Sequence, residues 1–211
     1  MNLNKIRNEI LNETKPYVIK YGWNEEMFLK VAKNSKYETA VILTLFPEGY
    51  ISLIQLYIDE VNIKMTDESK NLNLIRLKIH ERIRELCILR FDIMVKEKKL
   101  VSKTFLHLLL PNNYKFCLKN LYKTVDQIWY LAGDSSTDFN FYSKRVILAS
   151  IYSSTIIHFI NNNDFEKTID LLDKQLKKVA KIPKIKDRFN EFVKLVPHFF
   201  KLRKKFNFTK Q

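Results

Sequence analysis

The chain has 211 residues, which is enough for one compact domain or two small subdomains with a real hydrophobic core. It contains only three glycines and five prolines, so it offers little material for tight hairpins or glycine-rich phosphate loops, and the composition favours an all-α protein. The formal net charge is +14. Lysine, asparagine and isoleucine are all abundant, as an A+T-rich genome produces, so this total alone does not indicate a nucleic-acid partner.

For residues 1–47 the sequence predicts three short helices that form an N-terminal unit. The first helix is expected to bury a row of apolar residues: Ile6, Ile10, Val18 and Ile19. Asn24 is a good N-cap for the second, and Phe46 and Pro47 are expected to end the third, near 37–44. With YGW at the first turn, this arrangement resembles the helix-turn-helix of a tetracycline-repressor-type regulator.

DNA binding is therefore an obvious alternative function. The N-terminal unit carries seven basic and five acidic residues, a net charge of only +2. A recognition helix needs Arg, Lys, Asn or Gln to reach base edges, and the segment ETAVILTLF contains none of them. The sequence thus predicts the shape of a DNA reader without its reading residues.

Residues 48–181 predict a second, larger helical unit. Its helices are expected over 49–65, 72–94, 96–110, 112–132, 138–160 and 165–180, with Pro111 preventing one continuous helix. For the helix over 72–94 we expect an apolar row and place several arginines outside it. The row is Leu72, Ile75, Ile79, Ile83 and Leu86, and the arginines are Arg76, Arg82, Arg84 and Arg90. The aromatic and aliphatic stripes of this unit are typical of a packed core.

The most apolar stretch lies near the end of this unit. Val125, Ile128, Trp129 and Ala132 recur at helical spacing, and Gly133 ends their helix. The next helix has no charge from 146 to 160, which predicts burial nearly all round, with Ser and Thr hydroxyls bonded to backbone carbonyls. This uncharged run of 15 residues is shorter than the roughly 20 residues of a bilayer span.

Residues 182–211 predict a basic amphipathic helix. From residue 184 onward there are nine basic and two acidic residues, so half of the net charge lies in the last 28 residues. A basic face opposite a phenylalanine-rich face is typical of a helix in a membrane interface, although such a helix can also dock on its own domain or on a second subunit. The predicted membrane-binding residues are Phe189, Phe192, Val193, Val196, Phe199, Phe200, Lys201, Lys204 and Lys205.

No pattern of catalysis is present, and we predict no enzyme, no catalytic residue, no cofactor and no metal site. The sequence lacks P-loop, GxGxxG, GxSxG and HExxH motifs, and no His follows Glu at the spacing of a di-iron carboxylate bundle. His158 is expected to be a satisfied core histidine, and Cys87 and Cys117 to be two buried reduced thiols. Turn and capping roles account for Asp134 and Asp138.

The stretch TVDQIWYLAGDSSTDFNFYSKR carries a family resemblance. It is similar to the signature TVDxIWxxAGDxSTDFNxYxKR of the ubiquinone (coenzyme Q) biosynthesis accessory proteins, the ninth of the COQ proteins. The matching residues are Thr124, Val125, Asp126, Ile128, Trp129, Ala132, Gly133, Asp134, Ser136, Thr137, Asp138, Phe139, Asn140, Tyr142, Lys144 and Arg145. Phe141 stands where the family has Trp, and Ser143 where it has Thr.

This resemblance implies a tetracycline-repressor-like bundle that binds an isoprenoid quinone or a phospholipid and assists the demethoxyubiquinone hydroxylase. It also implies a homodimer through the helix 138–160 and its successor, and a docking patch for the hydroxylase. Carried onto this sequence, the patch is Asp126, Ile128, Tyr130, Phe141, Tyr142 and Arg145. Because the N-terminus shows no leader or transit character, we expect a bacterial cytoplasmic protein, peripheral on the inner face of the cytoplasmic membrane.

Overall fold

The computed structural model describes residues 3–180, and no strand occurs among them. The elements are α1 (Leu3–Tyr21), α2 (Glu25–Asn34), α3 (Thr39–Leu45), α4 (Tyr50–Ser69), η1 (Leu74–Arg76), α5 (Ile79–Val95), α6 (Lys98–Leu108), η2 (Pro111–Asn113), α7 (Tyr114–Leu131), α8 (Asp138–Asn161) and α9 (Phe165–Ala180). The predicted all-α class is confirmed. The amphipathic helix expected over 182–211, with its membrane-binding residues, lies outside the described residues.

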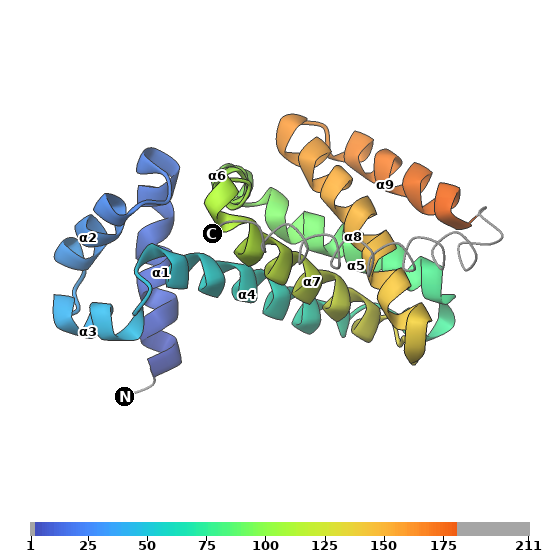
Figure 1. Cartoon of the computed structure of the whole chain (residues 1–211), viewed down its shortest axis with the longest axis horizontal. Helices are drawn as coiled ribbons and strands as arrows, with labels where there is room; N and C mark the ends of the chain where they lie inside the picture. Colours follow the sequence, from blue (N-terminus) through green and yellow to red (C-terminus); the bar gives the residue numbers. More distant parts are fainter. Residues whose placement is uncertain (1–2, 181–211) are drawn as a thin grey trace, which may run out of the picture.

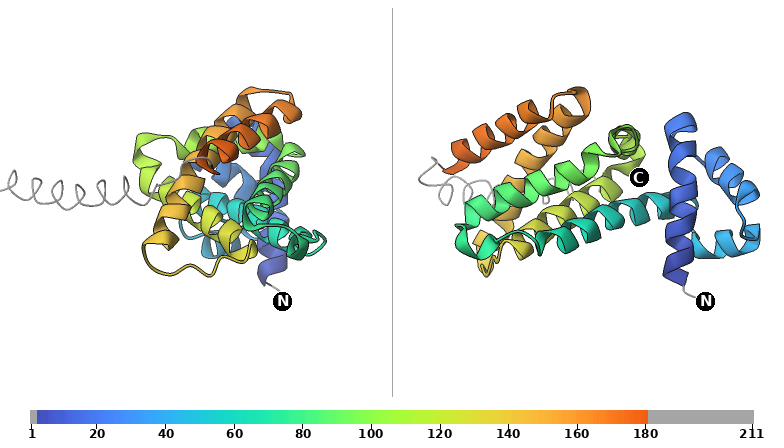
Figure 2. Two further views of the ribbon diagram at one scale, coloured as in Figure 1. Left: turned by 90° about the vertical axis from the view of Figure 1, so that its right-hand side faces the viewer. Right: turned by 180° about the vertical axis from the view of Figure 1, so that it is seen from behind.

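Helices α1, α2 and α3 gather at one end of the molecule, and α4 leads from them into the larger bundle (Figure 1). Within the bundle α4 packs chiefly against α5, and α8 packs against α7 and α9. The two further views show α9 on the outer side of α8 (Figure 2). The described chain is therefore a small three-helix unit, α1–α3, and a bundle of six helices, α4–α9. The first helix of the bundle, α4, connects the two.

Local sequence signals set several of these helix ends. The Asn24 side chain accepts a hydrogen bond from the backbone N–H of Met27 at 2.8 Å, so the predicted N-cap of α2 is confirmed. Between α7 and α8, Gly133 has a φ of +83°, a left-handed conformation that favours glycine. The Arg82 Nη1 donates to the Ala132 carbonyl at 3.0 Å beside this glycine and ties the turn to α5.

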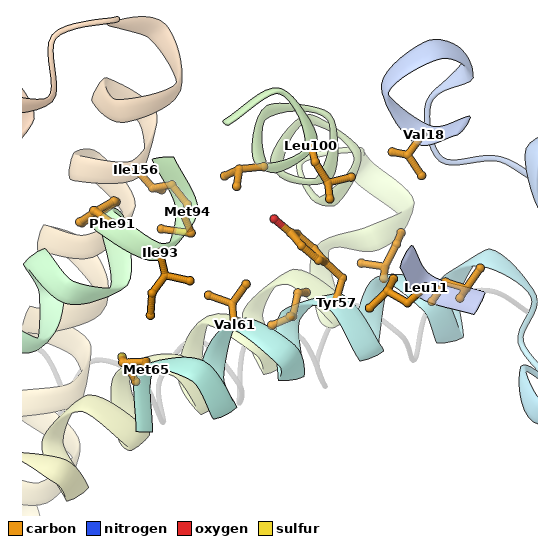
Figure 3. Close-up of a cluster of buried hydrophobic side chains, with 14 of the residues drawn as sticks. Leu11, Val18, Tyr57, Val61, Met65, Phe91, Ile93, Met94, Leu100 and Ile156 are labelled. Atoms are coloured by element: carbon orange, nitrogen blue, oxygen red, sulfur yellow. The ribbon is translucent and has the colours of Figure 1, made fainter. Parts of the chain in front are cut away.

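The buried side chains form a continuous hydrophobic cluster that connects the two units (Figure 3). Leu11 and Val18 on α1 pack toward Tyr57 of α4, while Val61 lies nearer Phe91 and its neighbours on α5. Because α1 shares its core with α4, the N-terminal unit and the bundle depend on common packing.

The predicted helix over 72–94 is wrong at its start. Residues Leu74–Arg76 form a 3-10 turn, and α5 begins only at Ile79. Ile75 is consequently 89% exposed and Ile79 44% exposed, so neither continues the buried row of Ile83 and Leu86.

Two further expectations about single residues are corrected. Ile19 is 42% exposed. The buried face of α1 contains Ile10 and Val18, and Ile19 lies beside that face. Arg90, placed outside the apolar row, is only 4% exposed. It lies seven positions after Ile83 and therefore on the same face of α5.

Helix α8 is less buried than its uncharged run predicts. Leu148 and Phe159 lie in the core, but Val146 is 53% and Ile157 45% exposed in the single chain. Helices α6, α7 and α9 contact α8 but leave Val146 and Ile157 open. The expected back-bonding of hydroxyls is confirmed at Thr155, whose Oγ1 donates to the Ile151 carbonyl at 2.8 Å.

Among the described helices, no single one combines the length and the apolar composition of a membrane span. Helices α3 and α4 meet those criteria together only as a pair bent by 62°.

Candidate ligand cavity and the α7–α8 corner

A cavity of about 170 Å³ lies inside the bundle, lined by residues from α4, α5, α6, α7 and α8. Most of its wall is apolar, with Ile58, Val61, Met94, Leu121 and Ile156 among the lining residues. An apolar cavity of about 150 Å³ is large enough for a benzene ring. The space therefore accepts one ring or a short branched hydrocarbon unit without any rearrangement.

Arg90 is the charged residue in this wall. Its Nε donates to the Tyr152 hydroxyl at 2.8 Å, its Nη1 to the Asn62 side-chain oxygen at 2.7 Å, and its Nη2 to the Thr124 hydroxyl at 3.4 Å. All three acceptors are neutral, and no ion pair to Arg90 occurs among the described residues. A guanidinium has five N–H groups, so two of them have no acceptor in the part of the chain that the structure describes.

This arrangement of Arg90 has an electrostatic consequence. A guanidinium stays protonated in proteins, and a buried charge without an opposite charge is unfavourable. An oxygen atom of a bound molecule that accepts one of the free N–H groups would offset part of that cost. The cavity is thus apolar on most sides and has a cationic hydrogen-bond donor on one.

Cys117 lines the same cavity and is half-buried, whereas Cys87 is fully buried, and both are free thiols. Burial raises the pKa of the Cys117 thiol, and it raises the pKa of Cys87 to about 12. Both thiols are therefore protonated at neutral pH, and neither is an activated nucleophile.

A second polar cluster lies at the corner where α7 turns into α8. The Nε of Arg145 contacts the Asp126 carboxylate at 2.5 Å, and its Nη1 contacts the Asp134 carboxylate at 3.2 Å. Lys144 adds a contact to Asp134 at 2.8 Å. The side chains of Arg145 and Asp134 are 4% and 2% exposed. The two positive and two negative groups balance, so this cluster holds the α7–α8 turn closed.

The Asp134 carboxyl is strongly biased towards its charged form. Burial by itself raises its pKa, but hydrogen bonds from Lys144, Ser136 and Arg145 outweigh that effect and lower the pKa to about 2. Asp134 is therefore ionised at any physiological pH, which agrees with a structural ion pair and not with acid/base chemistry.

The structure brings together most of the residues predicted to bind the hydroxylase. The Arg145 guanidinium lies 3.3 Å from the centre of the Phe141 ring, and Phe141 meets Tyr142 edge to face at 5.2 Å. Tyr142 is 61% and Tyr130 75% exposed. Ile128, by contrast, is completely buried in the core and offers no surface in this chain.

No group of three or more His, Cys, Asp or Glu side chains with metal-binding geometry occurs within residues 3–180. His158 is half-buried, and its Nδ1 lies 3.1 Å from the Thr168 hydroxyl, as expected of a satisfied histidine. The family resemblance implied a lipid cavity in this bundle, but sequence reasoning identified none of the residues that line it, and it placed Arg90 outside the buried row. A signal for Arg90 was available in its spacing of seven residues from Ile83 on one helix.

The fold is that of a tetracycline-repressor-type protein. It is similar to the crystal structure of a TetR transcriptional regulator from Nitrosomonas europaea with a TM-score of 0.69, at 17% sequence identity. The similarity covers 83% of this chain and 98% of that one. The predicted tetracycline-repressor-like fold is therefore confirmed.

The resemblance to the ninth COQ family is also confirmed. The COQ9 family profile matches residues 114–183, which include the α7–α8 corner. The chain is 27% identical to the mitochondrial ubiquinone biosynthesis protein COQ9-A of Xenopus laevis over 82% of its length, and 26% identical to COQ9 of Homo sapiens over the same share. It spans 57% of the length of each of these relatives.

The predicted localisation is wrong. The COQ9 relatives are mitochondrial proteins, not proteins of the bacterial cytoplasm or its membrane. The prediction depended on the lack of a targeting segment. The start of this sequence carries no information about compartment, because the chain spans only 57% of the length of these relatives.

Proposed function

We propose that this chain is a non-catalytic, lipid-binding accessory protein of ubiquinone biosynthesis that presents an isoprenoid quinone intermediate to the demethoxyubiquinone hydroxylase. The observation that carries the proposal is the apolar cavity with Arg90 in its wall, in a chain related to COQ9 ubiquinone biosynthesis proteins. The role in ubiquinone biosynthesis is supported by those relatives, and the lipid by the chemistry of the cavity.

A protein of this kind meets a physical need of the pathway. Each five-carbon isoprene unit costs on the order of 4 kcal/mol to expose to water, so a polyprenylated quinone stays in the bilayer. The cavity of about 170 Å³ shields one ring or one isoprene unit. The rest of a long ligand, or of a phospholipid, has to lie outside it or separate the helices.

Arg90 gives the ligand an orientation. Quinone carbonyls, hydroxyls and phospholipid phosphates all carry oxygen acceptors, whereas a pure hydrocarbon has none. The free N–H groups of Arg90 bind such an oxygen, and the apolar wall opposite receives the hydrocarbon part. The preferred ligand is therefore an amphiphile with an oxygen-bearing head.

The α7–α8 corner is the proposed docking surface for the hydroxylase. Fewer of its residues are available for contact than the family signature suggests. Tyr130 and Tyr142 supply exposed aromatic area, which is enriched at protein interfaces. Arg145 positions the Phe141 ring and closes the turn instead of reaching outward.

A homodimer through α8 and α9 is proposed from the exposed apolar residues Val146 and Ile157.

The proposed function is tested by reconstitution. The hydroxylase acts on demethoxyubiquinone embedded in vesicles, with and without this protein, and product is quantified. We expect wild-type protein to accelerate turnover, Tyr130→Ala with Tyr142→Ala to abolish the acceleration, and Tyr21→Ala, a change at another exposed tyrosine, to leave it intact. Equal turnover with and without the wild-type protein would contradict the proposal.

A ligand-responsive DNA-binding regulator is the second candidate, because the fold is that of such regulators. Helix α3, in the position of a recognition helix, has the sequence TAVILTL and presents Thr39, Ala40, Leu43 and Thr44 to solvent. None of these side chains makes a bidentate contact with a base edge, as Arg, Asn or Gln does. We expect no salt-dependent binding to duplex DNA, and micromolar binding at physiological salt would favour the regulator.

A further inference from the structure

The end of the bundle where α6 gives way to α7 exposes an unusual amount of apolar surface. We call it the α6–α7 tip and define it by five residues that are each between 49% and 59% exposed: Leu106, Leu109, Leu110, Tyr114 and Leu118. They lie on the last turns of α6, in the connection through η2, and on the first two turns of α7. Soluble proteins seldom leave neighbouring large side chains open in this way without an interaction partner.

The segment that forms the tip carries charged side chains of a single sign. Residues 98–125 contain six lysines and neither aspartate nor glutamate, and one of the six, Lys123, pairs with Asp59 of α4 at 2.7 Å. Lys103, Lys115 and Lys119 are exposed among the apolar residues of the tip, and none of them has a carboxylate partner in the described part of the chain. The tip is thus apolar and carries three exposed lysines that form no ion pair within residues 3–180.

We infer that the α6–α7 tip docks on an anionic lipid bilayer, with its leucines and Tyr114 among the acyl chains and its lysines at the headgroups. Apolar residues interleaved with lysines fit this partner, because lysine stems extend along apolar surface while their ammonium groups reach phosphates. A nucleic acid would match the lysines but leave the leucines exposed to water.

The tip is continuous with the cavity wall. Phe105, Leu108 and Leu109 of the α6 end and Cys117 and Leu121 of α7 line the cavity from the same two segments. Seating the tip in a bilayer therefore brings one wall of the cavity next to the lipid phase. The purpose of the contact rests on the proposed lipid-binding function, but the contact itself is measurable without it.

The experiment uses the full chain and vesicles of phosphatidylcholine with and without phosphatidylserine, with binding measured by co-sedimentation at low and at high salt. The apolar variant is Leu106→Ser with Leu110→Ser and Leu118→Ser, residues that do not line the cavity. Its matched control changes three comparably exposed residues elsewhere: Leu29→Ser, Leu43→Ser and Ile63→Ser. We expect at least tenfold weaker binding for the tip variant, because it removes apolar area that would be transferred from water into the bilayer. We expect no change for the control.

A second pair of variants tests the charge of the tip, and both sets lower the net charge of the chain by three. Lys103→Gln, Lys115→Gln and Lys119→Gln remove the tip lysines, whereas Lys33→Gln, Lys174→Gln and Lys178→Gln remove three exposed lysines elsewhere. We expect the tip set to weaken binding to phosphatidylserine vesicles by about fivefold per lysine at low salt. Neither set should alter binding to phosphatidylcholine alone.

Three outcomes separate the possibilities. Unchanged vesicle binding by both tip variants would overturn the inference, whatever residues 181–211 contribute. Unchanged vesicle binding together with a lower oligomeric mass in sedimentation would overturn it in favour of a second copy of this chain on the tip. Tip-dependent vesicle binding by a protein that retains no lipid in its cavity would uphold the inference while the proposed function fails.

Discussion

Arg90 and Arg145 are two buried guanidinium groups in opposite electrostatic situations. Each residue is about 4% exposed. Arg145 faces two carboxylates, Asp126 and Asp134, and its charge is used entirely within the protein. Arg90 faces three neutral oxygens beside a cavity and keeps free N–H groups. The difference indicates that the corner of α7 and α8 is built for stability, whereas the charge of Arg90 is available to a ligand.

The largest predicted effect follows from reversing the charge of Arg145. Arg145→Glu places a third carboxylate beside Asp126 and Asp134 in a buried site and is expected to cost about 3–5 kcal/mol of unfolding free energy. Urea denaturation measures the loss. Arg84→Glu, at a half-exposed pair with Asp173, is the control and should cost about 1 kcal/mol or less. Equal stability of Arg145→Glu and wild type would show that the corner is not a closed ion cluster.

Arg90→Met tests the opposite electrostatic situation, a buried guanidinium without a carboxylate partner among the described residues. The substitution removes a buried charge that has no carboxylate partner, so the unfolding free energy should change by no more than about 1–2 kcal/mol and can increase. Retention of a polar-headed lipid should fall at least tenfold. Thermal denaturation and lipid extraction from the same preparation measure both quantities. A large loss of stability without a loss of lipid would assign Arg90 to the scaffold, like Arg145.

Low pH should destabilise the ion cluster around Asp134 and Arg145, which contains carboxylates, but not the surroundings of Arg90, whose acceptors in the described part of the chain are all neutral. The pKa of Asp134 is lowered to about 2 in the folded state, so its contribution is complete above its unfolded pKa near 4 and is lost as the pH falls towards 2. At 1.36 kcal/mol per pKa unit, the contribution is about 2–3 kcal/mol. Denaturation at a series of pH values should show this loss in wild type and a smaller loss in Asp134→Asn. An identical pH dependence in the two proteins would contradict the assigned pKa.

The smallest expected effect is on thiol chemistry at the cavity. Cys117 lines the cavity and is half-buried, so it should react slowly with a maleimide, and more slowly still when a lipid is bound. Fully buried Cys87 should stay unmodified in the folded protein, and Cys117→Ser should remove all labelling. Mass spectrometry of timed samples gives the rates. A rate at Cys117 that does not depend on lipid would place the ligand outside this cavity.

Much of the fold was predictable from local signals, because helix caps and apolar spacing act over a few residues. Asn24 marks the start of α2, and Pro111 separates α6 from α7 as expected. The first residues of α5 were not predictable in this way, since Ile75 and Ile79 continue an apolar spacing that the 3-10 turn interrupts. Periodicity alone does not show where a backbone leaves the helix.

The candidate site was predictable only in part. The signature residues of the α7–α8 corner are contiguous in sequence, and their proximity follows from one turn. The cavity draws its wall from five helices, and each lining residue is individually indistinguishable from a core residue. The α6–α7 tip had a visible signal, an acid-free stretch from 98 to 125 with six lysines. The exposure of its leucines follows only from the packed structure.

Lipid binding in the cavity is tested most directly by native mass spectrometry of the purified protein and of its Leu121→Trp variant. Solvent extraction then identifies what each protein retains. Leu121 is half-buried in the cavity wall, so a tryptophan there fills the space while the ion cluster at Arg145 stays intact. We predict an oxygen-bearing isoprenoid or phospholipid on the wild type and none on the variant, at similar thermal stability. A wild type without lipid, or equal lipid on both proteins, would contradict lipid binding in this cavity.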